Sequence, residues 1–93
     1  MNIAIDYDDT YTAAPRLWQI LIDGADFLGH NVYIVTCRHD TPENREEVRV
    51  EFVKPHRHIF TGLAAKRWFC EHQKGIQIDV WIDDRPETIE RGM

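Results

Sequence analysis

Two short apolar segments that end in acids, one near each end of the chain, constrain the fold more than any other feature. The first is Asn2-Ile3-Ala4-Ile5, which leads into Asp6-Tyr7-Asp8-Asp9-Thr10, and the second is Ile78–Ile82, which leads into Asp83-Asp84-Arg85-Pro86. Short apolar runs of this kind are typical of strands that are covered on both faces. Carboxylates held close together repel each other unless a cation or a shared proton lies between them. The two segments therefore predict buried strands whose acidic ends meet at one site.

The spacing within the first acid cluster adds a geometric expectation. Side chains in a strand alternate between its two faces, so residues two apart point to the same side. If the extended conformation continues beyond Ile5, Asp6 and Asp8 share one side of the strand. The sequence therefore predicts that both carboxylates face the site.

Composition favours one folded domain over residues 1–93. The chain is 43% hydrophobic and 29% charged, which is ordinary for a folded protein and argues against disorder. It has no apolar stretch long enough to cross a membrane, so the cytoplasm is the expected location. A formal net charge of −5 disfavours stable binding to nucleic acid, although a nucleic-acid end stays open as a substrate.

Helical and extended patterns alternate along the rest of the chain. A helix is predicted to begin near Pro15, capped by Thr10 or Thr12, and to end at Gly29. The remaining predicted elements are strands at 32–36, 57–61 and 78–82, and helices from Thr41 to about Phe52 and from Ala64 to about Lys74.

This alternation predicts a parallel α/β sheet with right-handed crossovers. With about four strands in the order 4-1-2-3, the strand order reverses between the first and fourth strands, where ligands bind in sheets of this kind. Those are the two strands that end in acids. Because neighbouring strands lie about 4.8 Å apart, their terminal carboxylates could share one cation.

At this point the sequence resembles the haloacid dehalogenase superfamily of phosphotransferases, whose short motifs occur here in order. An apolar strand followed by D-x-D-x-T matches residues 2–10, and an apolar strand that ends in Thr matches Val32 to Thr36. A lysine near the start of the helix before the last strand matches Lys66, and a strand that ends in paired acids matches Asp83-Asp84. Asp9 stands where many members have Gly.

The resemblance implies a three-layer, Rossmann-like, doubly wound parallel sheet. Larger members carry a cap domain between the first and second motifs or between the second and third. Both intervals are too short for a cap here, so the resemblance implies a capless, minimal member.

The resemblance also assigns roles to the matching residues. Asp6 would be the nucleophile, and Asp8 would protonate the leaving group and then deprotonate the attacking water. Asp6, the backbone carbonyl of Asp8, Asp83 and Asp84 would hold Mg²⁺, which suits all-oxygen ligands. Thr36 would bind the phosphoryl group and Lys66 would supply a positive charge. Independently of the resemblance, Arg38 and His39 follow Thr36 closely and are expected to line the mouth of the site and contact substrate. Cys37, next to Thr36, is also a predicted substrate-binding residue.

These roles predict a Mg²⁺-dependent phosphatase that acts on a phosphorylated substrate. Without a cap the site would be open, which suits a phosphorylated macromolecule end. A small substrate such as a nucleotide, enclosed by a second copy of the chain in a homo-oligomer, is the other alternative. A rival from a different class is a non-catalytic phosphate- or metal-binding module on the same scaffold.

Overall fold

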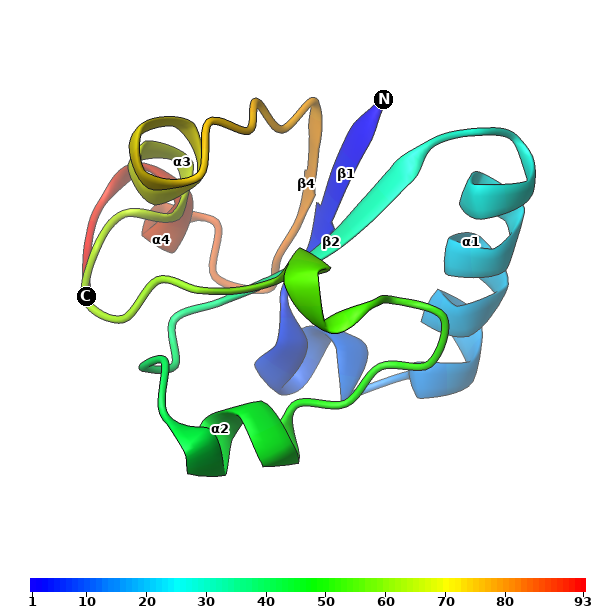
Figure 1. Cartoon of the computed structure of the whole chain (residues 1–93), viewed down its shortest axis with the longest axis horizontal. Coiled ribbons are helices and arrows are strands. Elements are labelled where there is room, and N and C mark those ends of the chain that lie inside the picture. Colours follow the sequence, from blue (N-terminus) through cyan, green and yellow to red (C-terminus); the bar gives the residue numbers. More distant parts are fainter.

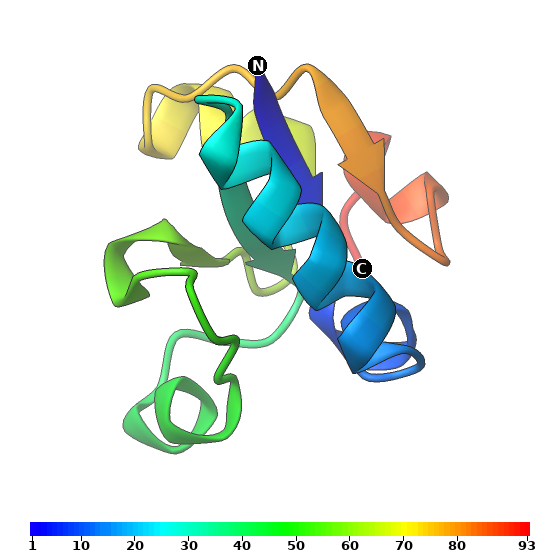
Figure 2. The same cartoon turned by 90° about the vertical axis from the view of Figure 1, so that its right-hand side faces the viewer.

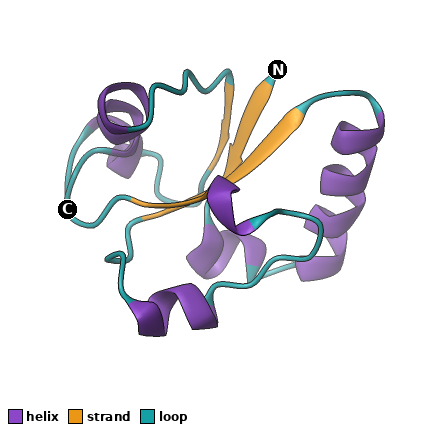
Figure 3. Ribbon diagram, in the orientation of Figure 1, coloured by secondary structure: helices purple, strands orange, loops and turns teal.

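The computed structural model describes all 93 residues and contains one parallel sheet of four strands. The strands are β1 (Asn2–Ile5), β2 (Asn31–Thr36), β3 (His58–Phe60) and β4 (Val80–Ile82). They lie in the order β3-β2-β1-β4, which reads 4-1-2-3 when counted from the β4 edge (Figures 1 and 3). The predicted parallel α/β sheet is confirmed, and the two strands that end in acids are neighbours.

Helices cover both faces of this sheet. They are α1 (Pro15–Phe27), α2 (Pro42–Glu47), α3 (Lys66–Trp68) and α4 (Glu87–Glu90). Helix α1 lies on one side of the strands, whereas α3 and α4 lie together on the other side (Figure 1). A quarter turn of the molecule brings α1 to the front, across the strands (Figure 2).

The alternation of side chains along the strands divides the core into two clusters. Ile3 and Ile5 of β1 belong to a cluster of ten buried residues that includes Ile22 of α1. Ala4, between them, belongs to a second cluster of five buried residues that includes Cys70. Burial on both faces explains why β1 reads as an uninterrupted apolar run.

The second predicted helix is shorter than expected. It begins at Pro42 with the hydroxyl of Thr41 accepting a hydrogen bond from the backbone N–H of Asn44 at 3.1 Å, but it ends at Glu47 instead of near Phe52. Beyond it, Val48, Val50 and Val53 are buried in the larger core cluster. The polar residues between these valines indicate an exposed helix. Burying the valines in the core is more favourable than continuing that helix, so the helix ends before them.

The start of α1 also differs from the prediction. Its N-cap residue is Ala14, and neither Thr10 nor Thr12 caps it. Thr12 instead accepts a hydrogen bond from the backbone N–H of Asp9 and closes the turn Tyr7–Tyr11, whose backbone is not helical at Asp8 and Asp9. Gly29 does follow the helix, with a φ of +83° that suits glycine.

The remaining elements lie close to their predicted places. Strands β3 and β4 are each shorter than the predicted ranges 57–61 and 78–82, and α3 passes into a wider turn at Phe69–Gln73. Only α1 lies between the turn Tyr7–Tyr11 and β2, and only α2 and a short turn, Pro55–Arg57, lie between β2 and β3. No helix of the structure has the length and apolar character needed to span a membrane.

Candidate active site

The carboxyl ends of β1, β2 and β4 open into a cavity of about 290 Å³. Each of these strands brings a polar side chain to the same edge of the sheet, because parallel strands all end there. Most residues predicted for the site line this cavity: Asp6, Asp8, Thr36, Cys37, Arg38, Lys66, Asp83 and Asp84. The expectation for His39 was wrong, since it does not line the cavity. The sequence therefore identified most of the residues that surround the cavity, and their geometry decides what each can do.

Asp6 is fixed at the centre of the site by the sheet itself. Its backbone N–H donates to the carbonyl oxygen of Ile82 at 2.9 Å, which continues the pairing of β1 with β4. Only 8% of the residue is exposed. The carboxylate of Asp6 is thus held on a rigid strand end, where its position is determined by the core.

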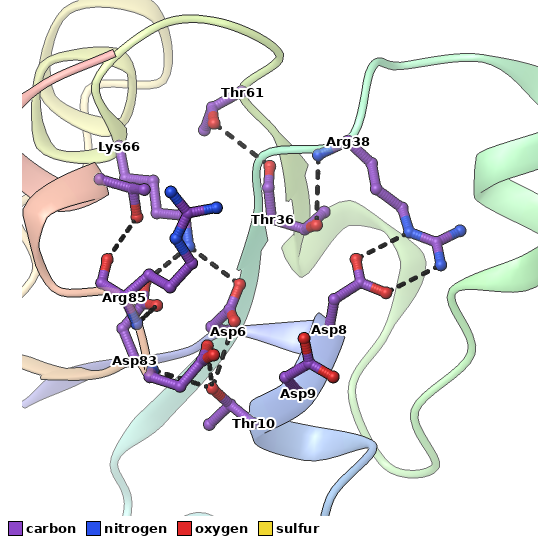
Figure 4. A network of polar contacts seen from close by, with 12 residues as sticks. Asp6, Asp8, Asp9, Thr10, Thr36, Arg38, Thr61, Lys66, Asp83 and Arg85 are labelled. Atoms are coloured by element: carbon purple, nitrogen blue, oxygen red, sulfur yellow. Dashed lines mark hydrogen bonds and ion pairs between the residues drawn. The ribbon is translucent and has the colours of Figure 1, made fainter. Parts of the chain in front are cut away.

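Lys66 reaches the same point from the start of α3. Its ammonium group donates to Asp6 Oδ1 at 2.9 Å and to Asp83 Oδ2 at 2.5 Å (Figure 4). The side chains of Lys66 and Asp83 are both 2% exposed. Burial opposes the charge on Lys66, but the hydrogen bonds to Asp83 and Asp6 outweigh it and raise the pKa of the ammonium group. The lysine therefore stays charged and joins β1 to β4.

The environment of Asp6 disfavours its ionised form. Burial raises the pKa of the Asp6 carboxyl to about 6, against the opposing effect of the nearby Lys66 ammonium. The Asp83 carboxylate and a hydrogen bond with Asp84 raise this pKa further. A cation beside Asp6 would relieve this penalty, because it favours the charged form of the carboxylate.

Thr10 connects the two acidic strand ends. Its hydroxyl lies 3.0 Å from Asp84 Oδ1 and 3.2 Å from Asp6 Oδ2, and it accepts a hydrogen bond from the backbone N–H of Asp84 at 3.1 Å. The backbone carbonyl of Thr10 accepts a hydrogen bond from the indole of Trp18 at 2.7 Å. Helix α1 thereby holds the turn that presents Thr10, which the prediction treated only as a helix cap and a motif residue.

Asp6, Asp83 and Asp84 form a cluster that could hold a metal ion. One carboxylate oxygen from each lies within 4.8 Å of the others. Burial opposes the charge on Asp84, but hydrogen bonds with Asp6 and Thr10 outweigh it and lower the pKa of that carboxyl. The donor set is entirely oxygen, which fits a hard cation such as Mg²⁺ better than zinc.

Asp8 does not share the direction of Asp6. Strand β1 ends at Ile5, and the chain turns within Tyr7–Tyr11, where Asp9 has a φ of +63°. Asp8 therefore points toward Arg38, and not toward the carboxylate cluster (Figure 4). The expectation that both carboxylates face the site holds in part. Both residues line the cavity, and the backbone is extended at Asp6 and again at Asp8, but Arg38 binds the carboxylate of Asp8.

Thr36 and Cys37 form the wall of the cavity at the end of β2. Thr36 is 1% exposed, and its hydroxyl accepts a weak hydrogen bond from the backbone N–H of Arg38 at 3.3 Å. Its hydroxyl hydrogen has no partner within the chain, so it can be donated to a bound oxyanion. Cys37 is a free, half-buried thiol on the same wall.

Four further residues line the cavity that sequence reasoning did not select as site residues: Asp9, Arg85, Thr88 and Met93. Asp9 lies inside the first acid motif, where the sequence analysis noted it only as a departure from Gly. Arg85 belongs to the second acidic segment, and its backbone N–H donates to Asp83 Oδ1 at 2.9 Å. Its position directly after the paired acids was a signal for a role at the rim. Thr88 and Met93 lie at the cavity because the chain after β4 turns back toward it. No local sequence pattern predicts that turn.

Comparisons of the chain with protein-family models, with curated proteins and with solved structures find no match. The class of protein that the fold and the site define is an α/β domain with a carboxylate cluster at the carboxyl ends of adjacent parallel strands. A more particular assignment depends on the chemistry of the site.

Proposed function

We propose that this chain is a Mg²⁺-dependent phosphomonoester hydrolase of the haloacid dehalogenase type, with Asp6 as the nucleophile. The observation that carries the proposal is the position of Asp6. It is buried at the end of the central strand, hydrogen-bonded to Lys66, with the carboxylates of Asp83 and Asp84 within 4.8 Å. A nucleophilic carboxylate, a fixed cation and a metal-binding pair are what phosphoryl transfer to an enzyme carboxylate requires.

The proposed fold assignment is a Rossmann-like, doubly wound domain without a cap. Helices on both faces of a parallel sheet support it, and so do the short connections from β1 to β2 and from β2 to β3. The cavity would then open directly to solvent. We also propose that the protein acts in the cytoplasm.

The proposed metal ligands are the carboxylates of Asp6, Asp83 and Asp84, with the backbone carbonyl of Asp8 as a fourth. Bound Mg²⁺ would neutralise charge on the phosphoryl oxygens and bring a dianion close to the acids of the site. Asp83 also bonds to Lys66, whereas Asp84 is exposed to solvent and bonds to Thr10. Asp84 is therefore the more available direct ligand.

In the proposed reaction, Asp6 attacks phosphorus and forms a P–O bond as the bond to the leaving oxygen breaks. A proton from Asp8 goes to that leaving oxygen. A water molecule then attacks the aspartyl phosphate and gives its proton to Asp8, and the bond between phosphorus and Asp6 breaks to release phosphate. Asp8 thereby returns to its starting state, and Asp6 is regenerated as a carboxylate.

Lys66 and Thr36 would stabilise the charge that spreads over the phosphoryl oxygens. Both are almost fully buried and held by the core, so neither has to reorganise during the reaction. Lys66 acts as a fixed positive charge, and the Thr36 hydroxyl acts as a hydrogen-bond donor. Cys37 and Arg38 would contact the substrate at the mouth of the cavity.

The test is hydrolysis of an aryl phosphate with Mg²⁺ and with a chelator. Turnover is expected only with Mg²⁺, and Asp6→Asn should abolish it while the protein stays folded. Asp9→Asn is the matched control. Asp9 lines the same cavity outside the carboxylate cluster, and Asn tolerates its φ of +63°. Unchanged turnover in Asp6→Asn would exclude the proposed nucleophile.

The contact between Asp8 and Arg38 favours the rival function, a phosphate- or metal-binding module without catalysis. In this arrangement the proposed acid is bound to a guanidinium group instead of facing Asp6. A screen over nucleotides, sugar phosphates, phosphopeptides and 3′-phosphorylated oligonucleotides separates the two functions. Binding of Mg²⁺ and phosphate with no phosphate release from any of these substrates would support the module.

A further inference from the structure

The outer face of α1 is unusually apolar for a helix that no other element covers. Leu17, Ile20, Phe27 and Leu28 are between 56% and 89% exposed, whereas the buried side of the helix is formed around Ile22. Leu17, Ile20, Gly24 and Phe27 recur at spacings of three and four residues, so they lie on one stripe. In Figure 2 this helix crosses the front of the molecule with nothing in front of it.

Phe52 is a second exposed aromatic residue near α1. Its side chain is 74% exposed, and it lines the same surface hollow as Asp26 of α1. Its φ of +66° is a strained value for a bulky residue, and such strain persists where the surrounding structure imposes it. The chain thus holds an aromatic side chain outward near Asp26, which lies on α1 about 100° around the helix from Phe27, so Phe52 lies outside the stripe.

We propose that the exposed stripe of α1, defined as Leu17, Ile20, Gly24, Phe27 and Leu28, is the interface of a twofold homodimer in which two copies of α1 pack antiparallel. The four large side chains expose on the order of 500 Å² per copy, or about 1,000 Å² in a dimer. That area is at the lower limit for a specific interface and predicts a dimer that dissociates on dilution.

The shape of the stripe matches a second copy of itself. In an antiparallel pair centred near Ile22, Ile20 of one copy faces Gly24 of the other, and Leu17 faces Phe27. Ile20 is 73% exposed and projects outward, whereas no atom lies within 4 Å of the place where a side chain at Gly24 would begin. Each Ile20 therefore has an open space at Gly24 of the other copy into which it can pack.

The charges on α1 also select an antiparallel copy. Arg16 lies in the first turn, and Asp23 and Asp26 lie in the second half, which is the reverse of what the helix dipole favours. All three are exposed, and none takes part in an ion pair within the chain. An antiparallel partner brings the positive end of each helix beside the negative half of the other. Arg16 and Asp23 lie on the same flank of the stripe, where they can pair across the interface.

The experiment is the molar mass of the full chain from micromolar to millimolar concentration, by sedimentation equilibrium. The mass is expected to rise from 11.0 kDa to twice that value and no further. Ile20→Glu and Phe27→Glu should each weaken association by at least about tenfold. Leu63→Glu is the control, because Leu63 is 64% exposed but lies outside the stripe, and it should leave association unchanged.

Gly24→Ala distinguishes weaker association from loss of folding. The added methyl group meets no atom of its own chain and favours the helix, so thermal stability should rise. The same methyl group fills the space for Ile20 of the other copy, so association should weaken. Increased stability together with unchanged association would overturn the proposed packing.

Charge reversal tests the antiparallel arrangement. Arg16→Asp and Asp23→Arg should each weaken association at low salt, and the double variant should restore it. A monomer at every concentration, growth beyond a dimer, or a dimer that Ile20→Glu does not disturb would each overturn the proposal. None of these measurements depends on phosphatase activity, so the proposed dimer and the proposed function are tested independently.

Discussion

The guanidinium group of Arg38 holds both carboxylate oxygens of Asp8, with Nε 2.9 Å from Oδ2 and Nη2 2.9 Å from Oδ1. The same group donates to Asn44 at 3.2 Å, pairs with Glu47, and lies over the ring of Tyr7. The hydrogen bond with Asp8 is the main cause that raises the pKa of Arg38. Asp8 is thus connected to α2 through Arg38.

We predict that Arg38→Met raises the KM for a phosphate ester by about tenfold. The cavity is lined by five carboxylates, and Arg38 is one of three cationic side chains that offset them. Loss of its charge should therefore weaken binding of an anion. Thermal stability should change little, because partly exposed ion pairs contribute about 0–1 kcal/mol. The measurements are steady-state kinetics and thermal unfolding of the same samples.

Arg38→Lys is the control for this prediction. It keeps the positive charge but loses the planar guanidinium group that binds two oxygens at once. Its KM should therefore lie between those of the wild type and Arg38→Met. A KM that does not change in Arg38→Met would mean that Arg38 does not contact the substrate.

The positions of the acids could be predicted from the sequence because they depend on strand ends. A buried strand is visible as an apolar run, and its end is visible where acids begin, so Asp6 and Asp83 could be located without coordinates. Lys66 could be preferred to Arg67 from its place near a helix start. In the structure Lys66 bonds to both acids, whereas Arg67 pairs with Glu90 at the surface.

The direction of Asp8 could not be predicted in the same way. It depends on where β1 ends and on a contact with Arg38, thirty positions further along the chain. The early end of α2 has a similar cause, since the burial of Val48 and Val50 is decided by tertiary packing. Local patterns identify which residues belong to the site, but contacts between distant segments set their orientation.

We predict that Lys66→Met destabilises the metal-free protein by about 3–5 kcal/mol, because it leaves two buried carboxylates without their partner. Asp6 and the side chain of Asp83 are almost fully buried, so solvent does not replace the lost charge. Added Mg²⁺ should recover part of the loss, since it binds only the folded state. The measurement is urea unfolding with chelator and with Mg²⁺.

Lys74→Met is the matched control for Lys66→Met. Lys74 is an exposed lysine that follows the same helical segment and makes no ion pair within 4 Å. Its replacement should change the free energy of unfolding by less than about 0.5 kcal/mol. Equal losses in the two variants would show that the contacts of Lys66 with Asp6 and Asp83 do not stabilise the fold.

We predict that the contribution of Asp6 to the stability of the metal-free protein falls as the pH rises from about 4 to about 6. Burial raises the pKa of Asp6 from 3.8 to about 6, so the folded state binds more protons than the unfolded state within this window. The stabilisation is therefore present below the window, falls as the pH rises through it, and is lost above it. The rise in pKa corresponds to about 3 kcal/mol.

The difference in unfolding free energy between the wild type and Asp6→Asn isolates this effect, because the variant cannot titrate at that position. In chelator, the variant should gain stability relative to the wild type between pH 4 and 6. With saturating Mg²⁺, the unfolding free energies of the two proteins should change with pH in the same way, since a bound cation favours the ionised carboxylate. A difference that is constant across the window would contradict the raised pKa.

Thr36→Val should lower kcat by about tenfold to a hundredfold and leave the fold intact. The hydroxyl of Thr36 lines the cavity, and its only partner in the chain is the backbone N–H of Arg38 at a long 3.3 Å. Thr61→Val makes the same change at the end of the neighbouring β3, where the hydroxyl donates to the backbone carbonyl of Thr36 at 3.2 Å outside the cavity. That variant should lose about 1 kcal/mol of stability and keep its kcat. If both variants lose activity in proportion to their stability, Thr36 supports the sheet and takes no part in binding the phosphoryl group.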